Sequence, residues 1–486
     1  MLTMACPEAN NIRIHMSIIR AQQPDFGQHV PLTIIGGGAC GMSAALAASD
    51  AGVECVVIEQ DAQPSGSTGM SYGAICAAGS RIQSEAGIED SAAAMFEDIL
   101  AITRNQTDPE LARLLANESG PTIDWLSQKH AIHLTLEAAW TGLGHRQPRL
   151  HAPVNRSGAT LMAMLAEACD TAGCPILTEA RVDALFADAH DVVTGVRMNR
   201  PDGSIEDIHT TAVVIATCGF GANRDWVQRH MPEISDARYF GHEGNRGDGI
   251  AWGQALGGEV KDMGAYQALG SLAEPQAVVI PHILLIAGGI QVNRDGRRFE
   301  DELTDISGQA LTILKQPDQC CWIIYDEPAH EDALSRFEEY RLAVEMRVPK
   351  SAASLRELAS SIGLPPDALV DTVDELAKYR AGTLRDPFGR QFQPDQQLRA
   401  PYFAIRVTGA LFHTQGGLSV DANAAVIRAD GTPLPNLYAG GGAARSVSGP
   451  GCWGYLPGMG LCTAVTLGRI AGESAARDIR GRRSGA

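Results

Sequence analysis

Residues 31–59 read PLTIIGGGACGMSAALAASDAGVECVVIE, and this stretch decides the fold. The short apolar run at 32–35 is typical of a buried parallel strand, and residues 42–49 are mostly Ala, Leu and Ser. A second apolar run, at 55–58, ends in Glu59. The stretch therefore predicts a strand, a tight turn, a thin helix and a second strand.

Three glycines, Gly36, Gly38 and Gly41, have the spacing G-x-G-x-x-G between the first strand and the helix. The first permits a tight turn, the second lets backbone N–H groups approach a pyrophosphate, and the third lets the helix pack against the strand. The helix N-terminus directs a partial positive charge at the phosphates, and Glu59 can hold a pair of ribose hydroxyls. The whole context favours a dinucleotide site over the alternative, a purely structural glycine turn.

Two further stretches favour FAD over NAD as the dinucleotide. Residues 63–79, QPSGSTGMSYGAICAAG, suit close backbone packing against a long extended cofactor. The buried run 211–217 leads into a second glycine turn at 218–223 that could pass beside the adenine. A final helix is expected at 460–476, and its N-terminal amides could stabilise the reduced, anionic flavin ring.

Composition limits the partners and the compartment. The chain has 486 residues, long enough for two domains, and its formal net charge of −18 argues against nucleic acid or an anionic membrane. Its 11 cysteines are scattered without a C-x-x-C pair, which fits reduced thiols in the cytoplasm. No Cys/His set has metal-ligand spacing, so no metal is expected, and no apolar window of about 20 residues predicts a membrane span.

Changes of pattern divide the chain into four parts. Residues 1–29 are expected to be a poorly ordered extension, with Met16 as an alternative start. An FAD-binding domain is expected at 30–241 and again at 412–486, interrupted by a cap domain at 242–411. Such an insertion places the active site at the domain interface, where pockets are common.

Local patterns predict several further elements. Residues 109–128 are expected to form two helices, and 145–157 an irregular polar loop that puts His145, Arg149 and His151 at the surface or against the cap. A hairpin is expected at 290–299 with Asp295 and Gly296 at its tip. The other expected elements are an antiparallel meander at 176–215, two helices at 352–382 split at 363–366, and paired strands at 418–420 and 425–428.

Taken together, the motifs between residues 31 and 476 resemble the fumarate reductase and ketosteroid dehydrogenase family of flavoproteins. The resemblance implies an α/β fold, with a Rossmann-like FAD-binding domain of the glutathione-reductase type and an inserted α+β cap. Covalent flavin members have a histidine near Ser67, so the serine here implies non-covalent FAD. The supporting marks, beyond the Gly36 turn and Glu59, are Ser67-Thr68, Arg149-x-His151, Gly219-Phe220-Gly221, Gly247-Asp248-Gly249, Arg298-Phe299, Thr414-x-Gly416-Gly417 and Gly468-Arg469-x-x-Gly472.

The residues expected to contact FAD come from these motifs and their neighbours. They are Gly36, Gly38, Ala39, Cys40, Gly41, Glu59, Gln60, Ser67, Thr68, Ser71, Gly73, Val182, Thr217, Gly219, Asp248, Gly441, Gly442, Gly458, Gly460 and Leu461.

The sequence departs from the fumarate reductase branch. That branch delivers a proton through an Arg after the Arg-Phe motif, but residues 302–306 read ELTDI, and the relay's upstream Glu and Arg would fall near His282 and Leu285. The dicarboxylate-binding Arg has no counterpart in 448–460. Only His413 and Gln267 remain from that site. Burying two carboxylates without those guanidiniums would leave their charge unpaired, which argues against fumarate reduction.

Residues 455–458, Tyr-Leu-Pro-Gly, are instead similar to a loop of ketosteroid dehydrogenases, in which a Tyr hydroxyl and a Gly N–H polarise a ring ketone. Two donors about 2.8 Å from the carbonyl oxygen stabilise enolate charge as it forms. A base then takes the α proton, and the β hydrogen leaves as hydride. The candidate bases are Tyr266, Tyr72 and Tyr239, because the family's cap-helix Tyr is missing between 302 and 314. The catalytic residues expected are Tyr455, Gly458, His413 and Tyr266.

The sequence thus predicts an FAD-dependent dehydrogenase that introduces a C=C bond α,β to the ketone of a cyclic substrate, a 3-ketosteroid or smaller, with an external electron acceptor. One alternative is a carboxylate oxidoreductase of the fumarate or tricarballylate type, in which His413 would contact substrate. Another is a non-catalytic flavin module whose partners supply heme or iron–sulfur centres. Both residues also have a purely structural alternative. Tyr455 could serve only for packing, and His413 could be a core histidine whose ring nitrogens are hydrogen-bonded within the protein.

Overall fold

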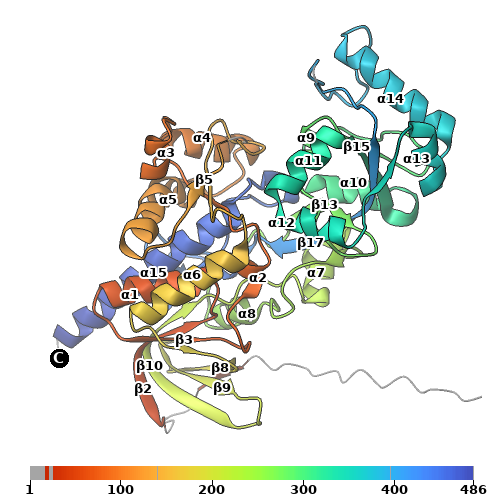
Figure 1. Ribbon diagram of the computed structural model, residues 1–486. Coiled ribbons are helices and arrows are strands. Elements are labelled where there is room, and N and C mark those ends of the chain that lie inside the picture. Colours follow the sequence, from red (N-terminus) through yellow and green to blue (C-terminus); the bar gives the residue numbers. More distant parts are fainter. Residues whose placement is uncertain (1–16, 21–25, 139–140, 395, 485–486) are drawn as a thin grey trace, which may run out of the picture.

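The computed structural model describes residues 17–20, 26–138, 141–394 and 396–484, which fold around two separate sheets (Figure 1). The larger, nine-stranded sheet has a parallel centre in which β10 (Ile205–Ile215) pairs with β2 (Gln28–Ile35) and β20 (Pro433–Ala439). On its other side β2 pairs with β3 (Cys55–Ile58), and β3 with β7 (Ile176–Leu177). The predicted α/β fold, with β2, β3 and the helix between them, is confirmed.

An antiparallel meander extends this sheet, as predicted, through β8 (Arg181–Ala187), β9 (Val193–Asn199) and β10. Beyond it, β1 (Ser17–Ile19) pairs in parallel with β8. The prediction of a poorly ordered extension was therefore wrong for residues 17–19, because their backbone groups complete the edge of the sheet. Met16 and the rest of 1–16 lie outside the described residues.

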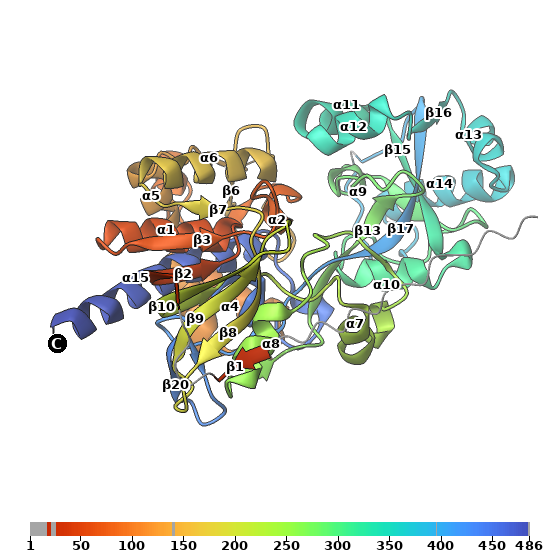
Figure 2. The ribbon, with the colours of Figure 1, turned by 90° about the horizontal axis from the view of Figure 1, so that it is seen from below.

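Two helices, α1 (Ala39–Asp50) and α15 (Met459–Ser484), pack against each other beside this sheet (Figures 1 and 2). Glycines of α15 make the contact possible. A Cβ atom added at Gly468 would lie 2.3 Å from the Cys40 carbonyl oxygen, and one at Gly472 would lie 2.2 Å from that of Ala44. The two backbones therefore touch, and no larger residue fits at either position.

Helix α5 (Pro109–Lys129) is continuous, so the prediction of two helices in this stretch was wrong. It begins at an Asp108 cap and runs through Pro121. Its buried face continues across the proline, with Leu115 before it and Ile123 after it. Packing of that face outweighs the backbone hydrogen bond that the proline removes. The helices on this side of the molecule are α2 (Gly66–Gly69), α3 (Arg81–Glu85), α4 (Ala92–Ile102) and α6 (Gly158–Thr171).

The second sheet is built on the long strand β17 (Tyr402–Thr414), which pairs with β13 (Tyr266–Ala273) and β15 (Cys320–Asp326). Its other strands are β11 (Arg238–Tyr239), β14 (Ile290–Val292) and β16 (Lys350–Ala352). The helices around it and on the path to it are α7 (Arg224–His230), α8 (Asp248–Ala255), α9 (Ile283–Ile286), α10 (Gly308–Leu314), α11 (Glu327–Arg336), α12 (Glu338–Glu345), α13 (Leu355–Ile362) and α14 (Pro366–Arg380). The pair α13 and α14 confirms the split predicted at 363–366. Of the described helices, none has the length and apolarity that crossing a bilayer requires.

Non-local pairing overturns one strand prediction and modifies another. The expected hairpin at 290–299 contributes only β14, which pairs with β15 rather than with the residues that follow the turn. Those residues leave the sheet because Arg298 forms buried ion pairs with Glu302 (2.8 Å) and Asp386 (2.5 Å). The expected pair at 418–420 and 425–428 is confirmed in part. Val420 and Val426 form an antiparallel bridge, and the Ile427 amide donates to the Ser419 carbonyl oxygen (3.0 Å). The named strands pair elsewhere as well, β18 (Gly417–Leu418) with β12 (Val260–Lys261) and β19 (Ala425–Ile427) with β20.

The predicted polar loop at 145–157 is largely buried and contains β6 (Leu150–Ala152), which pairs with β4 (Ile75–Cys76) and β5 (Thr135–Leu136). The surface positions expected for its charged and histidine side chains were therefore wrong. Arg149 is fully buried by ion pairs with Asp90 (2.7 Å) and Asp98 (2.6 Å). His151 is also fully buried, with Nδ1 2.8 Å from the Arg149 carbonyl oxygen and Nε2 2.7 Å from the Ser80 hydroxyl.

The α1–α15 contact predicts an asymmetric response to alanine. Gly472→Ala forces a Cβ into the α1 backbone, and we expect it to lower the free energy of unfolding by about 1–3 kcal/mol. Gly481→Ala, in the same helix with no atom within 4 Å of the added Cβ, is the matched control. Urea unfolding of the FAD-saturated proteins measures both, and equal stabilities of the two variants would contradict the contact.

The buried His151 predicts a pH dependence. Burial lowers the pKa of His151 to about 4, below the value of about 6.5 in an unfolded chain. Between those pH values the unfolded state binds a proton that the folded state does not, so stability falls as pH falls. We expect His151→Gln to reduce the slope of unfolding free energy against pH by about 1 kcal/mol per unit between roughly pH 5 and 6. His190→Gln, at an exposed position, should leave the slope unchanged.

Candidate active site

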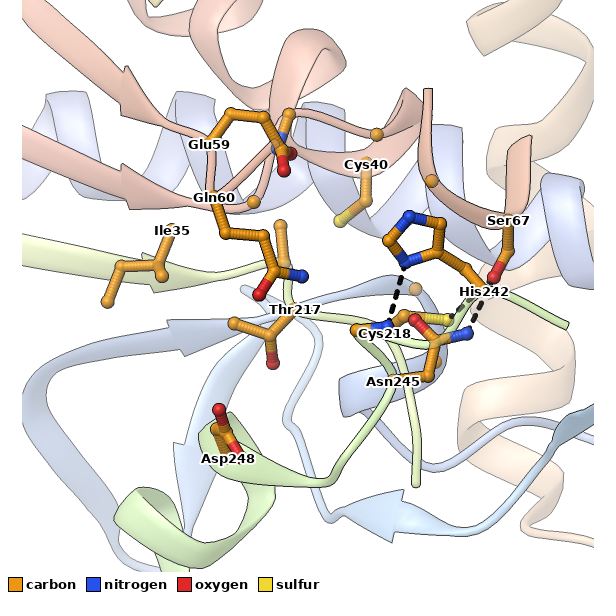
Figure 3. A pocket seen from close by; sticks show the side chains of 18 of the residues that line it. Ile35, Cys40, Glu59, Gln60, Ser67, Thr217, Cys218, His242, Asn245 and Asp248 are labelled. Carbon is orange, nitrogen blue, oxygen red and sulfur yellow. Dashed lines mark hydrogen bonds between the residues drawn. The ribbon is translucent and has the colours of Figure 1, made fainter. Parts of the chain in front are cut away.

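Two joined cavities run across the carboxyl edge of the larger sheet toward the second sheet. The first, of about 110 Å³, meets the ends of β2, β3 and β10 (Figure 3). The second, of about 370 Å³, continues from it, and the walls common to both are Ser67, Thr68, Cys218, Gly441, Gly442 and Ala464. Ligands of open α/β folds bind at this edge, so the joined cavities have the position expected for a dinucleotide.

The glycine turn shapes the first cavity. Gly36 has a left-handed backbone (φ +109°), and an added Cβ would lie 2.4 Å from the Ala216 carbonyl oxygen after β10. A Cβ at Gly41 would lie 1.9 Å from the Gly36 carbonyl oxygen. Gly38 is the N-cap of α1 and provides no side chain to cap the helix. The helix therefore begins against the sheet and directs its N-terminal dipole into the cavity.

Glu59 is held at the other side of the turn. Its Oε2 accepts a hydrogen bond from the Gly37 amide (2.7 Å), and its Oε1 accepts one from the Asp61 amide (2.9 Å). The side chain is buried and lines the cavity beside Gln60 (Figure 3). Both carboxylate oxygens are thus fixed in place with further acceptor capacity, as recognition of a pair of ribose hydroxyls requires.

Polar atoms without partners face the first cavity opposite the glycine turn. Thr217 Oγ1 and Asp248 Oδ1 are buried and have no hydrogen-bond partner among the described residues. Burial raises the pKa of Asp248, while Arg181, 3.4 Å away, opposes that shift. A ligand carrying hydroxyls and ring nitrogens would satisfy these atoms. The glycine cradle, the fixed carboxylate and these orphan atoms fit the adenosine and pyrophosphate of FAD.

The second cavity has a donor-rich end where the loop before α15 meets the end of β17. The rings of Tyr455 and His413 stand edge to face, with centroids 5.6 Å apart. Burial raises the pKa of the Tyr455 phenol, and the backbone of Gly458 and Gly460, beside the N-terminus of α15, opposes that shift. Buried His145 supports this loop, with Nε2 3.0 Å from the Pro457 carbonyl oxygen.

Two successive hydrogen bonds between side chains fix the tautomer of His413. The Ser448 hydroxyl donates to Gln415 Oε1 (3.1 Å), so the Gln415 amide nitrogen donates to His413 Nδ1 (2.9 Å). The ring proton then lies on Nε2, beside Gly460. Burial lowers the pKa of His413 to about 4. His413 is therefore a neutral N–H donor at this end of the cavity.

The wall that the second sheet contributes is mostly apolar. Its large side chains are Phe240, Leu269, Val279, Ile280, Ile283, Ile286, Ile306, Phe337 and Phe412. Arg336 is the one cationic Arg or Lys side chain among the described residues of the wall, and it pairs with Glu137 (3.3 Å) and Asp332 (3.2 Å). Glu339 and His282 also line the wall.

Most residues proposed from the sequence line one of the two cavities. In the first are Gly36, Gly38, Ala39, Cys40, Glu59, Gln60, Val182, Thr217 and Asp248; in the second are Ser71, Gly458, Gly460, Leu461, Tyr455 and His413; in both are Ser67, Thr68, Gly441 and Gly442. Gly41, Gly73 and Gly219 line neither, and allow close packing instead. A Cβ at Gly73 would meet the Ser157 carbonyl oxygen at 2.9 Å, and one at Gly219 the Thr414 hydroxyl at 1.9 Å.

Tyr266 is not brought to either cavity. It is fully buried in a separate core with Phe220 and Met231. Its neighbour Gln267 lines the second cavity, and because adjacent strand residues face opposite sides, Tyr266 faces away. Tyr239 also lies off the cavity walls, with its hydroxyl on the His242 carbonyl oxygen (3.1 Å). Only Tyr72 of the three proposed bases lines the second cavity.

Among the wall residues that were not proposed as contacts from the sequence are Cys218, Asn245 and His282. Cys218, in the left-handed region (φ +60°), lines both cavities, and Asn245 donates to Ser67 Oγ (2.7 Å) beside it (Figure 3). His282 lines the second cavity. Cys218 and Asn245 flank glycine motifs that the sequence shows, and His282 lies where the resemblance would place a residue of the fumarate reductase relay; these were the available signals.

The chain belongs to the FAD binding domain family, whose match covers residues 32–461. Together with the cavities described above, this makes the protein an FAD-dependent oxidoreductase. The predicted family, the enzyme class and FAD as cofactor are confirmed.

Individual relatives differ in the substrates that their names give. The chain is 29% identical over 447 residues to a probable fumarate reductase, Ifc3, of Shewanella frigidimarina, covering 91% of this chain and 74% of that protein. It is 27% identical over 554 residues to 4-oxocyclohexanecarboxylate 2-dehydrogenase of Sinomonas cyclohexanicum, covering 94% of each. Among solved structures, 3-ketosteroid-Δ4-(5α)-dehydrogenase of Rhodococcus jostii RHA1 superposes with a TM-score of 0.74 at 24% identity, over 94% of this chain and 98% of that one.

Glu59 provides a test of the cofactor site. Glu59→Ala removes a carboxylate that orders the turn and faces the ribose position, and we expect roughly 10- to 100-fold weaker FAD binding. Glu54→Ala, which removes an exposed carboxylate just before β3, is the matched control. Flavin fluorescence titration of the apoproteins measures both dissociation constants. Equal affinities for the two variants would exclude Glu59 from the cofactor site.

Proposed function

We propose that the protein is a dehydrogenase that introduces a C=C bond α,β to the ketone of a cyclic substrate. The observation that carries the proposal is the convergence of two neutral donors, the Tyr455 hydroxyl and His413 Nε2–H, at one end of a largely apolar cavity. Both side chains are half-buried, and neutral donors in such a place suit a ketone oxygen that gains negative charge during the reaction. The relative named for 4-oxocyclohexanecarboxylate, a cyclic ketone, supports the substrate class.

The donor end would act by preorganisation. The backbone of Gly458 and Gly460 lowers the pKa of the Tyr455 phenol against the larger effect of burial, so these amides favour negative charge at the phenol oxygen. Gln415 holds the His413 ring so that its N–H needs no reorientation. Gly458 lines the same cavity, where the sequence predicts that its amide contacts the ketone oxygen. When bound, FAD supplies the acceptor for the hydride that leaves the β carbon, and the α proton passes to a base on the cavity wall.

None of the three tyrosines proposed from the sequence is suited to act as that base, since Tyr239 and Tyr266 line neither cavity. Tyr72 packs against Phe337 with ring centroids 5.6 Å apart, and burial raises the pKa of its phenol. A neutral phenol cannot accept the α proton. The proposal therefore depends on the two donors rather than on a tyrosine base. An external electron acceptor, non-covalent FAD, a cap at 242–411 and a cytoplasmic location remain predictions from the sequence.

A carboxylate substrate is the alternative, because the Shewanella relative is named a probable fumarate reductase. The charges on the wall weigh against a dicarboxylate. Arg336 is already paired with two acids, and Glu339 adds an acidic group whose pKa burial raises. Dye reduction that depends on succinate or tricarballylate, and that is lost in His413→Ala, would favour this alternative.

Tyr455→Phe tests the ketone proposal. Removing the hydroxyl deletes one donor to the developing enolate, and we expect kcat for a cyclohexanone or a 3-ketosteroid to fall about 100- to 1000-fold with an artificial electron acceptor. FAD content should not change. Tyr402→Phe, at the far end of β17, is the control. Full activity in Tyr455→Phe, or no turnover of any cyclic ketone by the native enzyme, would remove the proposal.

A further inference from the structure

His282 immediately precedes α9 and lines the second cavity from the side of the second sheet. Both of its ring nitrogens, Nδ1 and Nε2, are buried, and neither has a hydrogen-bond partner among the described residues. Buried side-chain polar atoms are nearly always hydrogen-bonded, because an unpaired one keeps the full cost of desolvation. An imidazole with two unpaired nitrogens on a cavity wall therefore points to a ligand group.

The surroundings of His282 cannot satisfy it. Its neighbours on the wall, Ile280, Ile283 and Ile286, are apolar. The charged groups that influence it are Arg390 and Glu302. They are bonded to each other (2.9 Å), and the Arg390 guanidinium also donates to the carbonyl oxygens of Leu285 (2.7 Å) and Gly289 (2.8 Å).

The ring is neutral under ordinary conditions. Burial and the positive charge of Arg390 lower the pKa of His282 to about 4, while Glu302 opposes them. A neutral imidazole presents one N–H donor and one acceptor nitrogen. A hydroxyl can pair with either nitrogen and a carbonyl with the N–H, whereas a carboxylate would bring a charge that this wall does not compensate.

We propose that His282 is a specificity-determining residue that hydrogen-bonds a second, neutral polar group, a hydroxyl or a carbonyl, on the cyclic ketone. This inference rests on the proposed function, because it assigns the ketone itself to Tyr455 and His413. It adds a chemical class: the favoured substrates carry two uncharged oxygen functions, one at each side of the cavity.

Binding to the FAD-loaded enzyme tests the inference without turnover. The probes are two matched pairs, 4-hydroxycyclohexanone with cyclohexanone, and a 3-ketosteroid bearing a 17-hydroxyl with its 17-deoxy analogue. Perturbation of the flavin absorbance spectrum gives each dissociation constant. We expect the native enzyme to bind the hydroxylated member of at least one pair about tenfold more tightly. Equal affinities in both pairs, no binding of any probe, or a preference for 4-oxocyclohexanecarboxylate over 4-hydroxycyclohexanone would overturn the inference.

Two variants separate recognition from structure. His282→Leu should abolish the preference and leave the thermal midpoint unchanged or raised, because it replaces an unpaired polar group by an apolar one. His282→Gln, which keeps a donor and an acceptor, should restore part of the preference. His190→Leu, at an exposed site, is the control for a histidine-to-leucine change. A preference that persists in His282→Leu would overturn the inference.

Dye reduction with the same probes distinguishes this inference from the proposed function. Turnover of ketones without any His282-dependent preference removes the inference alone. A His282-dependent preference without turnover of any ketone removes the dehydrogenase proposal and leaves His282 as a recognition residue.

Discussion

Direct contact between backbones, made possible by glycine, is the constraint on which this structure depends. Helix α1 is held between β2, through Gly41, and α15, through Gly468 and Gly472. The N-terminus of α1 closes the adenosine end of the site, and the N-terminus of α15 supports the Tyr455 loop at the other end. One helix pair therefore connects the end of the site proposed to bind the adenosine of FAD with the end proposed to polarise the substrate.

The two ends of the site use electrostatics in opposite ways. At the adenosine end, Glu59 keeps an ordered carboxylate because two backbone amides donate to it. At the substrate end, burial favours the neutral forms of His413 and Tyr455, and charge appears there only when the substrate develops it. Fixed neutral dipoles of this kind stabilise a transient anion without first binding a permanent one.

The sequence predicted the parts of the fold that depend on neighbouring residues. The strand–glycine–helix unit, the acid at Glu59 and the α13–α14 pair all follow from local spacing. The errors arose where distant residues decide the outcome. Arg149 is buried because Asp90 and Asp98 neutralise it, and β14 pairs with β15 rather than with its own sequence neighbours. Tyr266 and Gln267 were indistinguishable as pocket residues until the register of β13 fixed their faces, and His282 belongs to no motif.

Strand β17 has a mechanical consequence. Its first half pairs with β15 and β16 within the second sheet. Its last residues, His413 and Thr414, line the second cavity. A hydrogen-bonded strand transmits displacement along its length. Movement of that sheet relative to the larger one would therefore displace the His413 imidazole from Tyr455, which lies on the loop before α15.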